Sequence, residues 1–289
     1  MSGLVAVTGS TGGIGGRIAT HLADAGVAQR LIVRDAGRAP QVAGAEVAVA
    51  QGYLDRAGMT TALRGADTLF LVSGRESASR VAEHTSAIDA AVEAGVRRVV
   101  YLSFSAAAPD TTFTFGRDHW HTEQHVRAQG LDFTFLRDNM YLDYVPVFAS
   151  ADGVIAGPAA DGRLAGVSRD DVGAAAAAVL AGDGHDGAIY ELTGPEAFTL
   201  AEAADVLTEV TGRPVRYHAE TEEEAYASRA HFGAPDFEVA GWVTSYTAVA
   251  NGDLERVTDD VERLTGRRPQ SLREFLAAHP ESVAHLTGA

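Results

Sequence analysis

Short apolar runs alternate with longer helical patterns through the first half of the chain. The runs that predict strands are residues 4–8, 31–34, 46–50, 68–73, 98–103 and 133–137. Continuous apolar runs of this length are typical of parallel strands that helices cover on both faces. Helical periodicity is clearest at residues 14–25, 77–94 and 118–129. Gly26, Gly95 and Gly130 follow these helices, where a left-handed residue commonly ends a helix.

This alternation predicts an α/β fold with a Rossmann-like, doubly wound parallel sheet, because short strand–helix connections produce right-handed crossovers. The rhythm breaks after residue 137, where helices at 172–181, 199–211 and 272–278 accompany a strand at 188–192. Thr199 and Glu202 form a capping-box pattern at the second of these helices. We expect residues 1–138 to form the sheet domain, rejoined by about 168–192. Residues 139–167 and 193–289 are then expected to form a smaller, partly interleaved α/β lobe.

A glycine-rich segment, TGSTGGIG at residues 8–15, joins the first strand to the first helix. This placement is typical of a dinucleotide site. Gly9 permits a tight turn, Gly12 lets a pyrophosphate approach the backbone, and Gly15 lets helix and strand pack. The helix N-terminus adds amide hydrogens and a partial positive charge. The cofactor-binding candidates of this segment are Thr8, Gly9, Thr11, Gly12, Gly13, Ile14 and Gly15.

The end of the second strand bears on which dinucleotide binds. A carboxylate there holds the ribose 2′-hydroxyl of NAD, whereas a guanidinium suits the 2′-phosphate of NADP. The strand ends in Arg34, which favours NADP(H), although Asp35 follows directly and leaves NAD(H) possible. Asp55, after the third strand, is a candidate for the adenine amino group or, equally, a loop cap. Ser73, at the end of the fourth strand, is a further cofactor-binding candidate.

Composition narrows the chemistry. The chain of 289 residues has no cysteine and no lysine, and its 23 basic residues oppose 39 acidic ones for a formal net charge of −16. Thiol nucleophiles, Cys-based metal sites, Schiff-base lysines and a Tyr-x-x-x-Lys dyad are thereby excluded. The negative charge argues against nucleic acid and anionic membranes as partners, and no apolar run approaches the roughly 20 residues of a membrane span. We expect a soluble, cytoplasmic protein.

A pair of histidines raises the question of a metal site. His121 and His125 lie four residues apart in a predicted helix, a spacing that is compatible with zinc. The sequence lacks HExxH and identifies no distant third ligand, so we expect no metal. It also lacks a G-x-S-x-G elbow, which disfavours a serine hydrolase.

Five segments beyond the glycine loop carry a family pattern. They are LIVRD at residues 31–35, GVRRVVYLSFSAA at 95–107, HTEQHVRAQGLDFTFLRDNMY at 121–141, SRDDVGAAAAAVL at 168–180 and GAIYELTGPEAFTLAEAADVL at 187–207. The chain thus resembles the NmrA-like branch of the atypical short-chain dehydrogenase/reductase superfamily and, within it, the bacterial type 2 NADPH:quinone oxidoreductases. The resemblance extends to about residue 269. It implies a Rossmann-like domain, a small C-terminal substrate lobe and NADPH in the cleft between them.

Ordinary members of that superfamily carry Tyr-x-x-x-Lys on the helix after the fifth strand. Aligned on Thr122 and Glu123, this chain has Phe115 at the tyrosine position and His119 at the lysine position, so the usual proton donor is missing. Quinone reductases of this branch resemble the chain in having a histidine there. Two interpretations of His119 stay open. It gives a hydrogen bond or a proton to the substrate near neutral pH, or it lies on an exposed helix face.

Further site candidates lie at the ends of the fifth and sixth strands. Ser103 aligns with the usual serine of the superfamily and is a catalytic or cofactor-binding candidate, or else a strand-end cap. The resemblance implies that Asn139 and Tyr141, with Met140 between them, line the nicotinamide pocket. Candidate substrate contacts are Phe104, Phe115, Met140, Tyr144 and Trp242, although side chains of this kind are more often part of a core or interface.

The leading hypothesis is an NADPH-dependent oxidoreductase that transfers a hydride to a quinone or similar conjugated carbonyl compound. Such acceptors form an aromatic phenolate and need little acid assistance, so holding and electrostatic stabilisation suffice. A second hypothesis keeps the cofactor but reduces a biosynthetic ketone, imine or enone. A third is an NADP(H)-sensing regulatory protein that signals to a protein partner without turnover. A homodimer is possible, and the sequence leaves the acceptor open.

Overall fold

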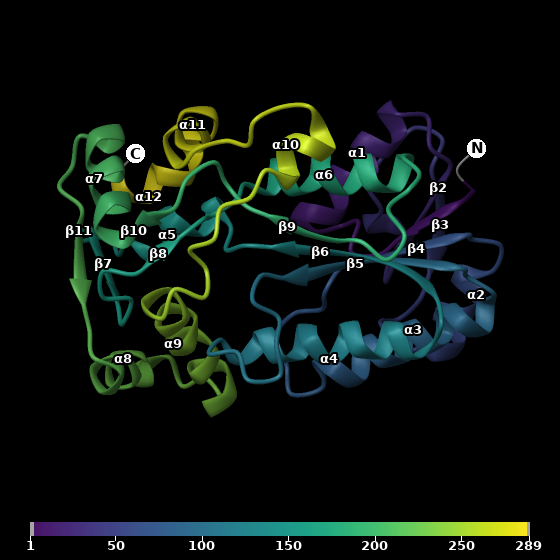
Figure 1. The fold of residues 1–289 in the computed structure, drawn as a ribbon, viewed down its shortest axis with the longest axis horizontal. Coiled ribbons are helices and arrows are strands. Elements are labelled where there is room, and N and C mark those ends of the chain that lie inside the picture. The colour runs from purple at the N-terminus through teal and green to yellow at the C-terminus, as the bar shows by residue number, and fades with distance from the viewer. Residues whose placement is uncertain (1–2, 288–289) are drawn as a thin grey trace. The chain divides into compact units, whose positions relative to one another are not determined.

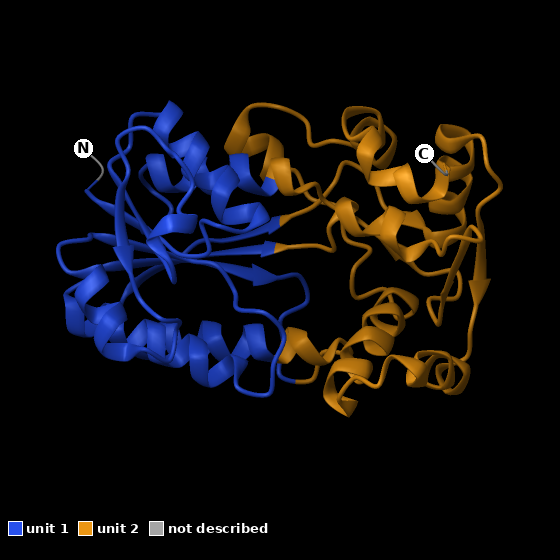
Figure 2. Cartoon of the chain, turned by 180° about the vertical axis from the view of Figure 1, so that it is seen from behind, with its two compact units in different colours: residues 1–109, 118–137, 172–191 blue, residues 110–117, 138–171, 192–289 orange. Residues whose placement is uncertain are grey.

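The computed structural model describes residues 3–287, which form two compact units (Figure 2). Unit 1 comprises residues 1–109, 118–137 and 172–191. Unit 2 comprises residues 110–117, 138–171 and 192–289. The assignment of cofactor binding to the first part of the chain and of substrate binding to the second stays a prediction.

A seven-stranded sheet forms the centre of unit 1, with the order β3-β2-β1-β4-β5-β6-β9 (Figure 1). Its strands are β1 (Val5–Val7), β2 (Gln29–Val33), β3 (Glu46–Val49), β4 (Thr68–Leu71), β5 (Arg98–Phe104), β6 (Asp132–Asp138) and β9 (Ile189–Leu192). The pairs β1–β2, β1–β4, β2–β3 and β4–β5 are parallel. Backbone hydrogen bonds from Phe135 to Ala188 and from Asn139 to Leu192 advance in the same direction, so β9 is parallel to β6. The predicted doubly wound parallel sheet is confirmed.

The strand order reverses at β1, which has β2 and β3 on one side and β4 on the other. In doubly wound sheets, ligands bind outside the carboxyl ends of the strands at this reversal. The segment after β1 is the glycine loop, residues 8–12, and the segment after β4 is residues 72–79. The topology therefore places both segments at the expected ligand-binding edge.

Helices cover both faces of this sheet, with α1 and α6 on one face and α2, α3 and α4 on the other (Figure 1). Their bounds are α1 (Gly13–Asp24), α2 (Arg56–Leu63), α3 (Arg80–Ala94), α4 (Thr114–Ala128) and α6 (Arg169–Ala181), and a short 3-10 turn, η1 (Ala36–Arg38), follows β2. Gly26, Gly95 and Gly130 adopt φ values of +69°, +81° and +70°, which confirms the predicted helix ends.

Helix α2 is absent from the sequence prediction. Its eight residues, RAGMTTAL, include a glycine and two threonines, which have low helix propensity. Asp55 caps its N-terminus, and Met59 and Leu63 anchor it to the sheet with 1% and 0% of their surface exposed. Tertiary burial therefore overrides a weak local preference.

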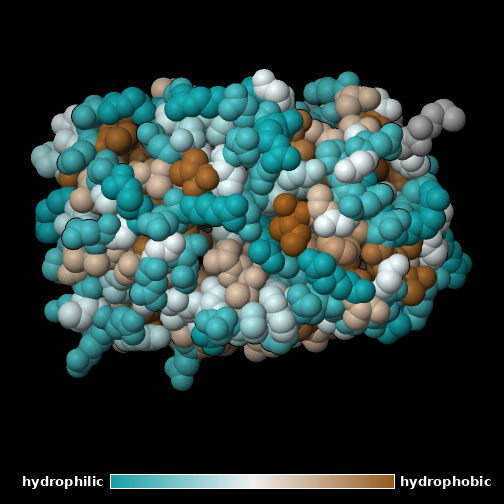
Figure 3. All heavy atoms as spheres, viewed as in Figure 1, coloured by the Kyte–Doolittle hydropathy of each residue, from teal (hydrophilic) through white to brown (hydrophobic). Residues whose placement is uncertain are grey.

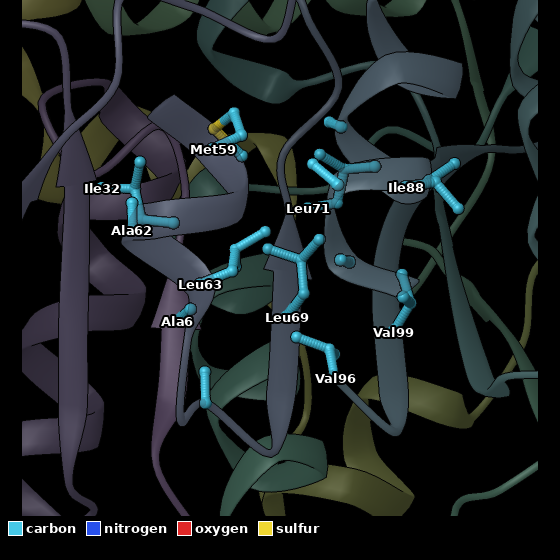
Figure 4. Close-up of a cluster of buried hydrophobic side chains, with 14 of the residues drawn as sticks. Ala6, Ile32, Met59, Ala62, Leu63, Leu69, Leu71, Ile88, Val96 and Val99 are labelled. Atoms are coloured by element: carbon cyan, nitrogen blue, oxygen red, sulfur yellow. The ribbon is translucent and has the colours of Figure 1, made fainter. Parts of the chain in front are cut away.

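The core beneath α2 and α3 consists mostly of aliphatic side chains (Figure 4). Met59 and Leu63 from α2 and Ile88 from α3 join Leu69 and Leu71 of β4 in one buried cluster. Each of these side chains is at most 1% exposed, so truncating any one of them to alanine costs about 2–5 kcal/mol. This packing holds the strands whose carboxyl ends form the ligand-binding edge.

The expectation that helices cover every strand on both faces is wrong for β3. Val47 and Val49 of this strand are 47% and 45% exposed. Strand β3 is the last strand of the order and pairs only with β2. An apolar run alone does not distinguish an edge strand from a central one, because β-branched residues suit both positions.

Unit 2 contains two small sheets and several helices. Strand β7 (Val154–Gly157) pairs in parallel with β11 (Arg216–Ala219), and β8 (Arg163–Leu164) pairs antiparallel with β10 (Phe198–Thr199). The helical elements are η2 (Leu142–Tyr144), α5 (Val145–Phe148), α7 (Leu200–Thr211), α8 (Glu222–Arg229), η3 (Ala230–Phe232), α9 (Asp236–Ala250), α10 (Asp260–Thr265), α11 (Leu272–Ala278), η4 (Pro280–Val283) and α12 (Ala284–Thr287). The predicted capping box at Thr199 and Glu202 is confirmed.

The surface carries mixed polarity. Hydrophilic side chains cover most of the face drawn in Figure 3, and hydrophobic ones form small separate groups. Within residues 3–287, none of the helices combines the length and the apolar character that crossing a membrane requires.

The glycine loop closes against helix α1 through direct backbone contact. A Cβ on Gly15 would lie 2.4 Å from the Gly9 carbonyl oxygen. Gly9 itself has φ +63°, and a Cβ there would lie 3.0 Å from Val72 Cβ. Gly15 is therefore required because there is no space for a Cβ. Gly9 is required because of its positive φ and because a Cβ would crowd Val72.

We expect Gly15→Ala to lower the free energy of unfolding by about 2 kcal/mol or more, because the new methyl group overlaps the Gly9 carbonyl. Gly16→Ala is the matched control, since its Cβ would lie 3.2 Å from the Ser10 carbonyl oxygen and alanine favours a helix. Urea denaturation measures both variants. Equal stability of the two would contradict the contact at Gly15.

Candidate functional site

A cavity of about 300 Å³ lies in unit 1 at the switch point of the sheet. Its wall comes from the segments that follow β1, β2, β3 and β4 and from helices α2 and α3. The lining residues are Thr8, Gly9, Thr11, Ile32, Val33, Arg34, Ala50, Gly52, Tyr53, Met59, Val72, Ser73, Gly74, Arg75 and Glu83. Of the predicted cofactor-binding residues, the structure thus brings together Thr8, Gly9, Thr11, Arg34 and Ser73.

The cavity combines an apolar wall with exposed positive charge. Ile32, Ala50 and Met59 are buried and supply aliphatic surface. Arg34 and Arg75 are exposed, and neither guanidinium has a hydrogen bond or ion pair to another residue in the range 3–287. Such an arrangement suits a flat heterocycle that carries an anionic substituent.

The glycine loop offers further anion-binding groups. Gly12 is the N-cap of α1, no side chain caps that helix, and its first turn contains no acidic residue. The free amides and the partial positive charge of this helix end therefore face no competing carboxylate from the helix itself. Ser10 Oγ is buried and has no hydrogen-bond partner among the described residues. A polar group of a ligand would satisfy it.

Thr8 is tied into the cavity wall. Its hydroxyl donates to the Phe70 carbonyl at 3.1 Å and accepts from the Val72 amide at 2.9 Å. The Tyr53 hydroxyl lies 2.9 Å from Thr8 Oγ1 and 2.6 Å from the Val72 carbonyl. Burial raises the pKa of Tyr53 to about 12, so the phenol stays protonated and keeps donating. These contacts connect β1 to β4 beside the glycine loop.

Two aspartates considered for cofactor binding act as caps. Asp35 accepts a hydrogen bond from Gly37 N at 2.9 Å and caps η1. Asp55 accepts from Gln51 N at 2.9 Å and from Gly58 N at 3.0 Å, and these bonds lower its pKa. Neither carboxylate belongs to the cavity lining, because a short aspartate side chain before a helix readily accepts from its own backbone.

Ser103 belongs to a buried ion-pair network. Its hydroxyl donates to Glu123 Oε1 at 2.7 Å. Arg137 binds the same carboxylate with two donors, Nε at 2.8 Å to Oε1 and Nη2 at 2.7 Å to Oε2. The hydrogen bonds that Arg137 donates to Glu123 raise the pKa of Arg137. The serine therefore has a structural partner, and its proposed substrate contact would have to use its remaining lone pairs.

His119 is buried, not exposed, since only 5% of its surface is accessible. Nε2 lies 3.0 Å from Arg80 Nη2, and Nδ1 lies 3.0 Å from the Tyr101 hydroxyl. Arginine can only donate, so Nε2 is the acceptor and Nδ1 carries the hydrogen that points at Tyr101. Burial, and next the charge of Arg80, lower the pKa of His119 well below its ordinary value.

This geometry excludes one interpretation of His119, and the other stays a prediction. The exposed-face interpretation is wrong because the ring lies between Arg80 and Tyr101. The role of proton donor is not favoured either, since the ring is neutral and its one N–H is used inside unit 1. Phe104 packs beside it with ring centroids 5.9 Å apart.

Asn139 and Tyr141 have internal partners in unit 2. Asn139 donates from Nδ2 to the Leu254 carbonyl at 3.0 Å and accepts from Met140 N at 2.7 Å. The Tyr141 hydroxyl donates to Asp138 Oδ2, and burial raises the pKa of Tyr141 well above its ordinary value. Both side chains thus fix the turn after β6, and a contact with cofactor would come from the backbone or the tyrosine ring.

Arg169 and two tyrosine rings form a compact group in unit 2. The guanidinium carbon of Arg169 lies 5.0 Å from the Tyr141 ring centroid and 4.8 Å from that of Tyr144. Cation–π contacts of this kind hold both rings in place. Tyr144 keeps 44% of its surface exposed. Of the aromatic candidates in unit 2, Tyr144 therefore retains accessible surface for a substrate.

The other substrate candidates of unit 2 are packed to different degrees. Phe115 is 7% exposed, and its ring lies so close to Gly241 that a Cβ there would be 2.2 Å from it. Met140 borders a cavity of only about 10 Å³. Trp242 is half-buried and meets the Phe232 ring edge-on at 5.7 Å. Phe115 and Met140 are therefore part of the packing of this unit.

The histidines considered for zinc have other surroundings. His125 Nε2 lies 2.8 Å from Asp89 Oδ1, and the His121 ring packs edge-on against Trp120. Across residues 3–287, no group of three or more histidines and carboxylates is arranged to hold a metal ion.

The comparison with known protein families completes the description of this site. The model of the NmrA-like family matches residues 1–276. The chain belongs to the NmrA-like family.

Relatives of this NmrA-like protein include several reductases. It is 33% identical to quinone oxidoreductase 2 of Escherichia coli, with 98% of each chain covered. It is 37% identical to (4-alkanoyl-5-oxo-2,5-dihydrofuran-3-yl)methyl phosphate reductase of Streptomyces griseus, covering 97% of this chain and 99% of that one. A solved structure of the Escherichia coli quinone oxidoreductase complexed with NADPH superimposes with a TM-score of 0.86 at 32% identity, covering 95% of this chain and 99% of that chain.

Sequence reasoning about this NmrA-like protein missed four residues near the cavity. Arg75 and Tyr53 line it, and Arg80 and His84 contact the Gly74 peptide in its wall. The i, i+4 spacing of Arg80 and His84 on a predicted helix was a usable signal, because it places two polar side chains on one face. No local signal identifies Tyr53, whose role depends on the pairing of β1 with β4.

The pH dependence of stability follows from His84, which is fully buried. Burial lowers its pKa to about 3, whereas the unfolded chain has a pKa near 6.5. Below pH 6.5, His84 becomes protonated in the unfolded chain, whereas it stays neutral in the folded protein down to much lower pH. Stability is therefore lost as pH falls, by up to about 1.4 kcal/mol per pH unit for this histidine.

We expect the free energy of unfolding of the NmrA-like protein to fall more steeply between pH 6.5 and 4.5 than that of His84→Gln, which cannot bind this proton. The advantage of histidine over glutamine then shrinks towards acid pH. Urea denaturation at several pH values measures the difference. Parallel curves for the two proteins would show that His84 takes no part.

Proposed function

We propose that this protein is an NADPH-dependent oxidoreductase that transfers a hydride to a quinone or a similar conjugated carbonyl compound. The observation that carries the proposal is the cavity at the switch point, which is lined by the glycine loop up to Thr11 and by Arg34 and Arg75. The uncapped N-terminus of α1 follows Thr11 directly, and within residues 3–287 neither guanidinium has a hydrogen bond or ion pair. Similarity over nearly the full length to a quinone oxidoreductase, and to its structure complexed with NADPH, supports both the cofactor and the reaction.

The residues present fit NADPH. The backbone of the glycine loop and the amides of α1 would hold the pyrophosphate, with Ser10 Oγ available as a further donor. Arg34 and Arg75 would hold the 2′-phosphate, since a guanidinium binds phosphate through two parallel donors. Ile32 and Met59 would cover the adenine ring. This set supports NADP(H) over NAD(H), because Asp35 is engaged by Gly37 and does not line the cavity.

One carboxylate, Glu83, also lines the cavity. It accepts a hydrogen bond from Ser79 Oγ at 2.7 Å and lies 3.3 Å from Ser77 Oγ. These hydroxyls disperse part of its charge. The lining thus carries two positive groups, Arg34 and Arg75, and one negative group, Glu83. The resulting net positive charge favours an anionic cofactor.

Bound NADPH supplies the hydride, and the protein's part is to bind, orient and exclude water. No lysine exists in the chain, Phe115 stands where the superfamily has tyrosine, and the His119 N–H is engaged by Tyr101. No side chain at these positions is thus arranged to protonate a product oxygen. A quinone suits such a site because its product is a stabilised phenolate that solvent can protonate. Tyr144 and Trp242 remain proposed substrate contacts through their accessible ring surface.

A biosynthetic conjugated carbonyl compound is the second candidate acceptor. The 37% identity to a furanone phosphate reductase favours it specifically, because that relative acts on a small oxygen heterocycle rather than a quinone. In either case the ligand is a small molecule. The net charge of −16 is unfavourable for nucleic acid.

We expect Arg34→Ala to raise the KM for NADPH at least about tenfold while leaving the KM for NADH nearly unchanged, since a lost charge-assisted contact to the 2′-phosphate is worth about 1.4 kcal/mol or more. Arg38→Ala is the matched control, because Arg38 lies four residues on and does not line the cavity. Steady-state kinetics with both cofactors measures the ratio. An equal loss with NADPH and NADH would assign Arg34 a merely structural role.

We expect the purified protein to oxidise NADPH when small benzoquinones or naphthoquinones are added, as followed by absorbance and by hydroquinone formation. Gly12→Val serves as the control, since it places a bulky side chain on the exposed surface of the glycine loop. Turnover of a cyclic enone but no quinone would favour the second candidate. Tight NADPH binding without turnover of any acceptor would instead support the regulatory hypothesis.

A further inference from the structure

The segment after β4 is held by buried side chains that the proposed reaction does not otherwise use. Residues 72–75 all line the cavity. At the centre of this segment, the Gly74 N–H donates to His84 Nε2 at 2.8 Å, and the Gly74 carbonyl accepts from Arg80 Nε at 2.9 Å. His84 is 0% exposed and Arg80 is 3% exposed. The two peptide groups on either side of the Gly74 Cα are therefore each fixed by a side chain of α3.

The second ring nitrogen of His84 is held by a residue of α4. His84 Nε2 accepts, so Nδ1 carries the hydrogen and donates it to Thr122 Oγ1 at 2.8 Å. Thr122 Oγ1 donates in turn to the Asp118 carbonyl at 2.8 Å. The hydrogen bonds run in one direction, from the loop through α3 into α4. We call this series, from Gly74 N–H through His84 and Thr122 to the Asp118 carbonyl, the relay. Every donor in the relay has an acceptor, so only one orientation of the imidazole satisfies all of these hydrogen bonds.

Arg80 connects the loop to the second histidine. Its Nη2 donates to His119 Nε2 at 3.0 Å, and His119 Nδ1 reaches Tyr101 of β5 at 3.0 Å. Its nearest carboxylate, Asp118 Oδ2, is 3.8 Å from Nη1, and Nη1 makes no hydrogen bond within the described chain. Burying a guanidinium with such limited compensation is unfavourable relative to apolar packing. Stability alone therefore does not account for this arrangement.

We propose that Arg80 and His84 are positioning residues that hold residues 72–75 in the conformation required to bind NADPH, and that Thr122 and His119 orient them. The inference rests on the proposed function. The two fixed peptide groups join Gly74 to Ser73 and to Arg75, so their orientation sets where the side chains of Ser73 and Arg75 lie on the cavity wall. His119 then acts through Arg80 rather than on the substrate.

Thr122→Val tests the relay, and Thr134→Val is its matched control. Thr134 is equally buried in unit 1, accepts from Arg98 at 3.0 Å and donates to the His185 carbonyl at 2.7 Å. We expect Thr122→Val to accelerate hydrogen exchange in residues 72–79 of the cofactor-free protein. We also expect a rise of about fivefold in the KM for NADPH with kcat nearly unchanged, as one weakened hydrogen bond implies. Thr134→Val should change neither.

A second pair of variants tests the contact with Gly74 directly. His84→Gln keeps an acceptor for the Gly74 N–H, whereas His84→Phe removes it at similar volume. We expect the KM for NADPH to stay within about threefold of the wild type in the first and to rise about tenfold in the second. If His84→Phe does not fold, the comparison of Thr122→Val with Thr134→Val tests the proposal by itself.

The proposal is overturned if Thr122→Val and Thr134→Val match in both loop exchange and KM, or if His84→Gln is as impaired as a folded His84→Phe. Failure of the proposed function has a different signature. In that case the wild type itself does not bind NADPH in a fluorescence titration, while exchange of residues 72–79, measured without cofactor, still reports on the relay.

Discussion

Helix α1 can follow strand β1 so closely only because no side chain stands between Gly9 and Gly15. The Gly9 carbonyl would lie 2.4 Å from a Cβ on Gly15, so the loop and the first turn of the helix touch through backbone alone. This contact directs the amides of α1 towards the carboxyl edge of the sheet. It also places Gly9 beside Val72, which joins the glycine loop to the segment after β4. The cavity wall therefore depends on glycine at positions 9 and 15, where a Cβ would collide with the neighbouring backbone or with Val72.

Arg80, which is buried, and Arg137, which is half-buried, show two different surroundings for a guanidinium in unit 1. Arg137 meets Glu123 with two hydrogen bonds of 2.8 and 2.7 Å, so its charge is locally neutralised. Arg80 lies 3.8 Å from the Asp118 carboxylate and instead donates hydrogen bonds to the Gly74 carbonyl and to the His119 imidazole. The first arrangement is expected of a structural ion pair. The second keeps a positive charge beneath a cavity wall, where burial and, next, this charge lower the pKa of both neighbouring histidines.

Much of the fold could be predicted from the sequence because the strands are short apolar runs and the helices end at glycines such as Gly95. The glycine loop and Arg34 were equally accessible, since their roles depend on position relative to a strand end. Helix α2 and the exposed edge strand β3 were not, because burial there is decided by neighbours far along the chain. The same applies to His119: its helix was predicted, but the side that faces Tyr101 depends on how α4 packs.

Local competition for the backbone explains why Asp35 and Asp55 do not line the cavity. Asp35 and Asp55 carry carboxylates suitable for a ribose or an adenine, yet each lies beside unpaired amides of a helix start and binds those instead. A sequence pattern does not show which partner wins. Arg75 illustrates the opposite case, an ordinary loop residue that becomes part of the cavity because β1 and β4 are adjacent.

The relay behind Gly74 has one more property. A peptide N–H stands at its start and a peptide carbonyl at its end, and neither group ionises at neutral pH. His84, between them, has its acceptor nitrogen turned to the loop and its N–H turned to Thr122. The series therefore transmits orientation from α4 to the cavity wall without offering a path for proton transfer between them.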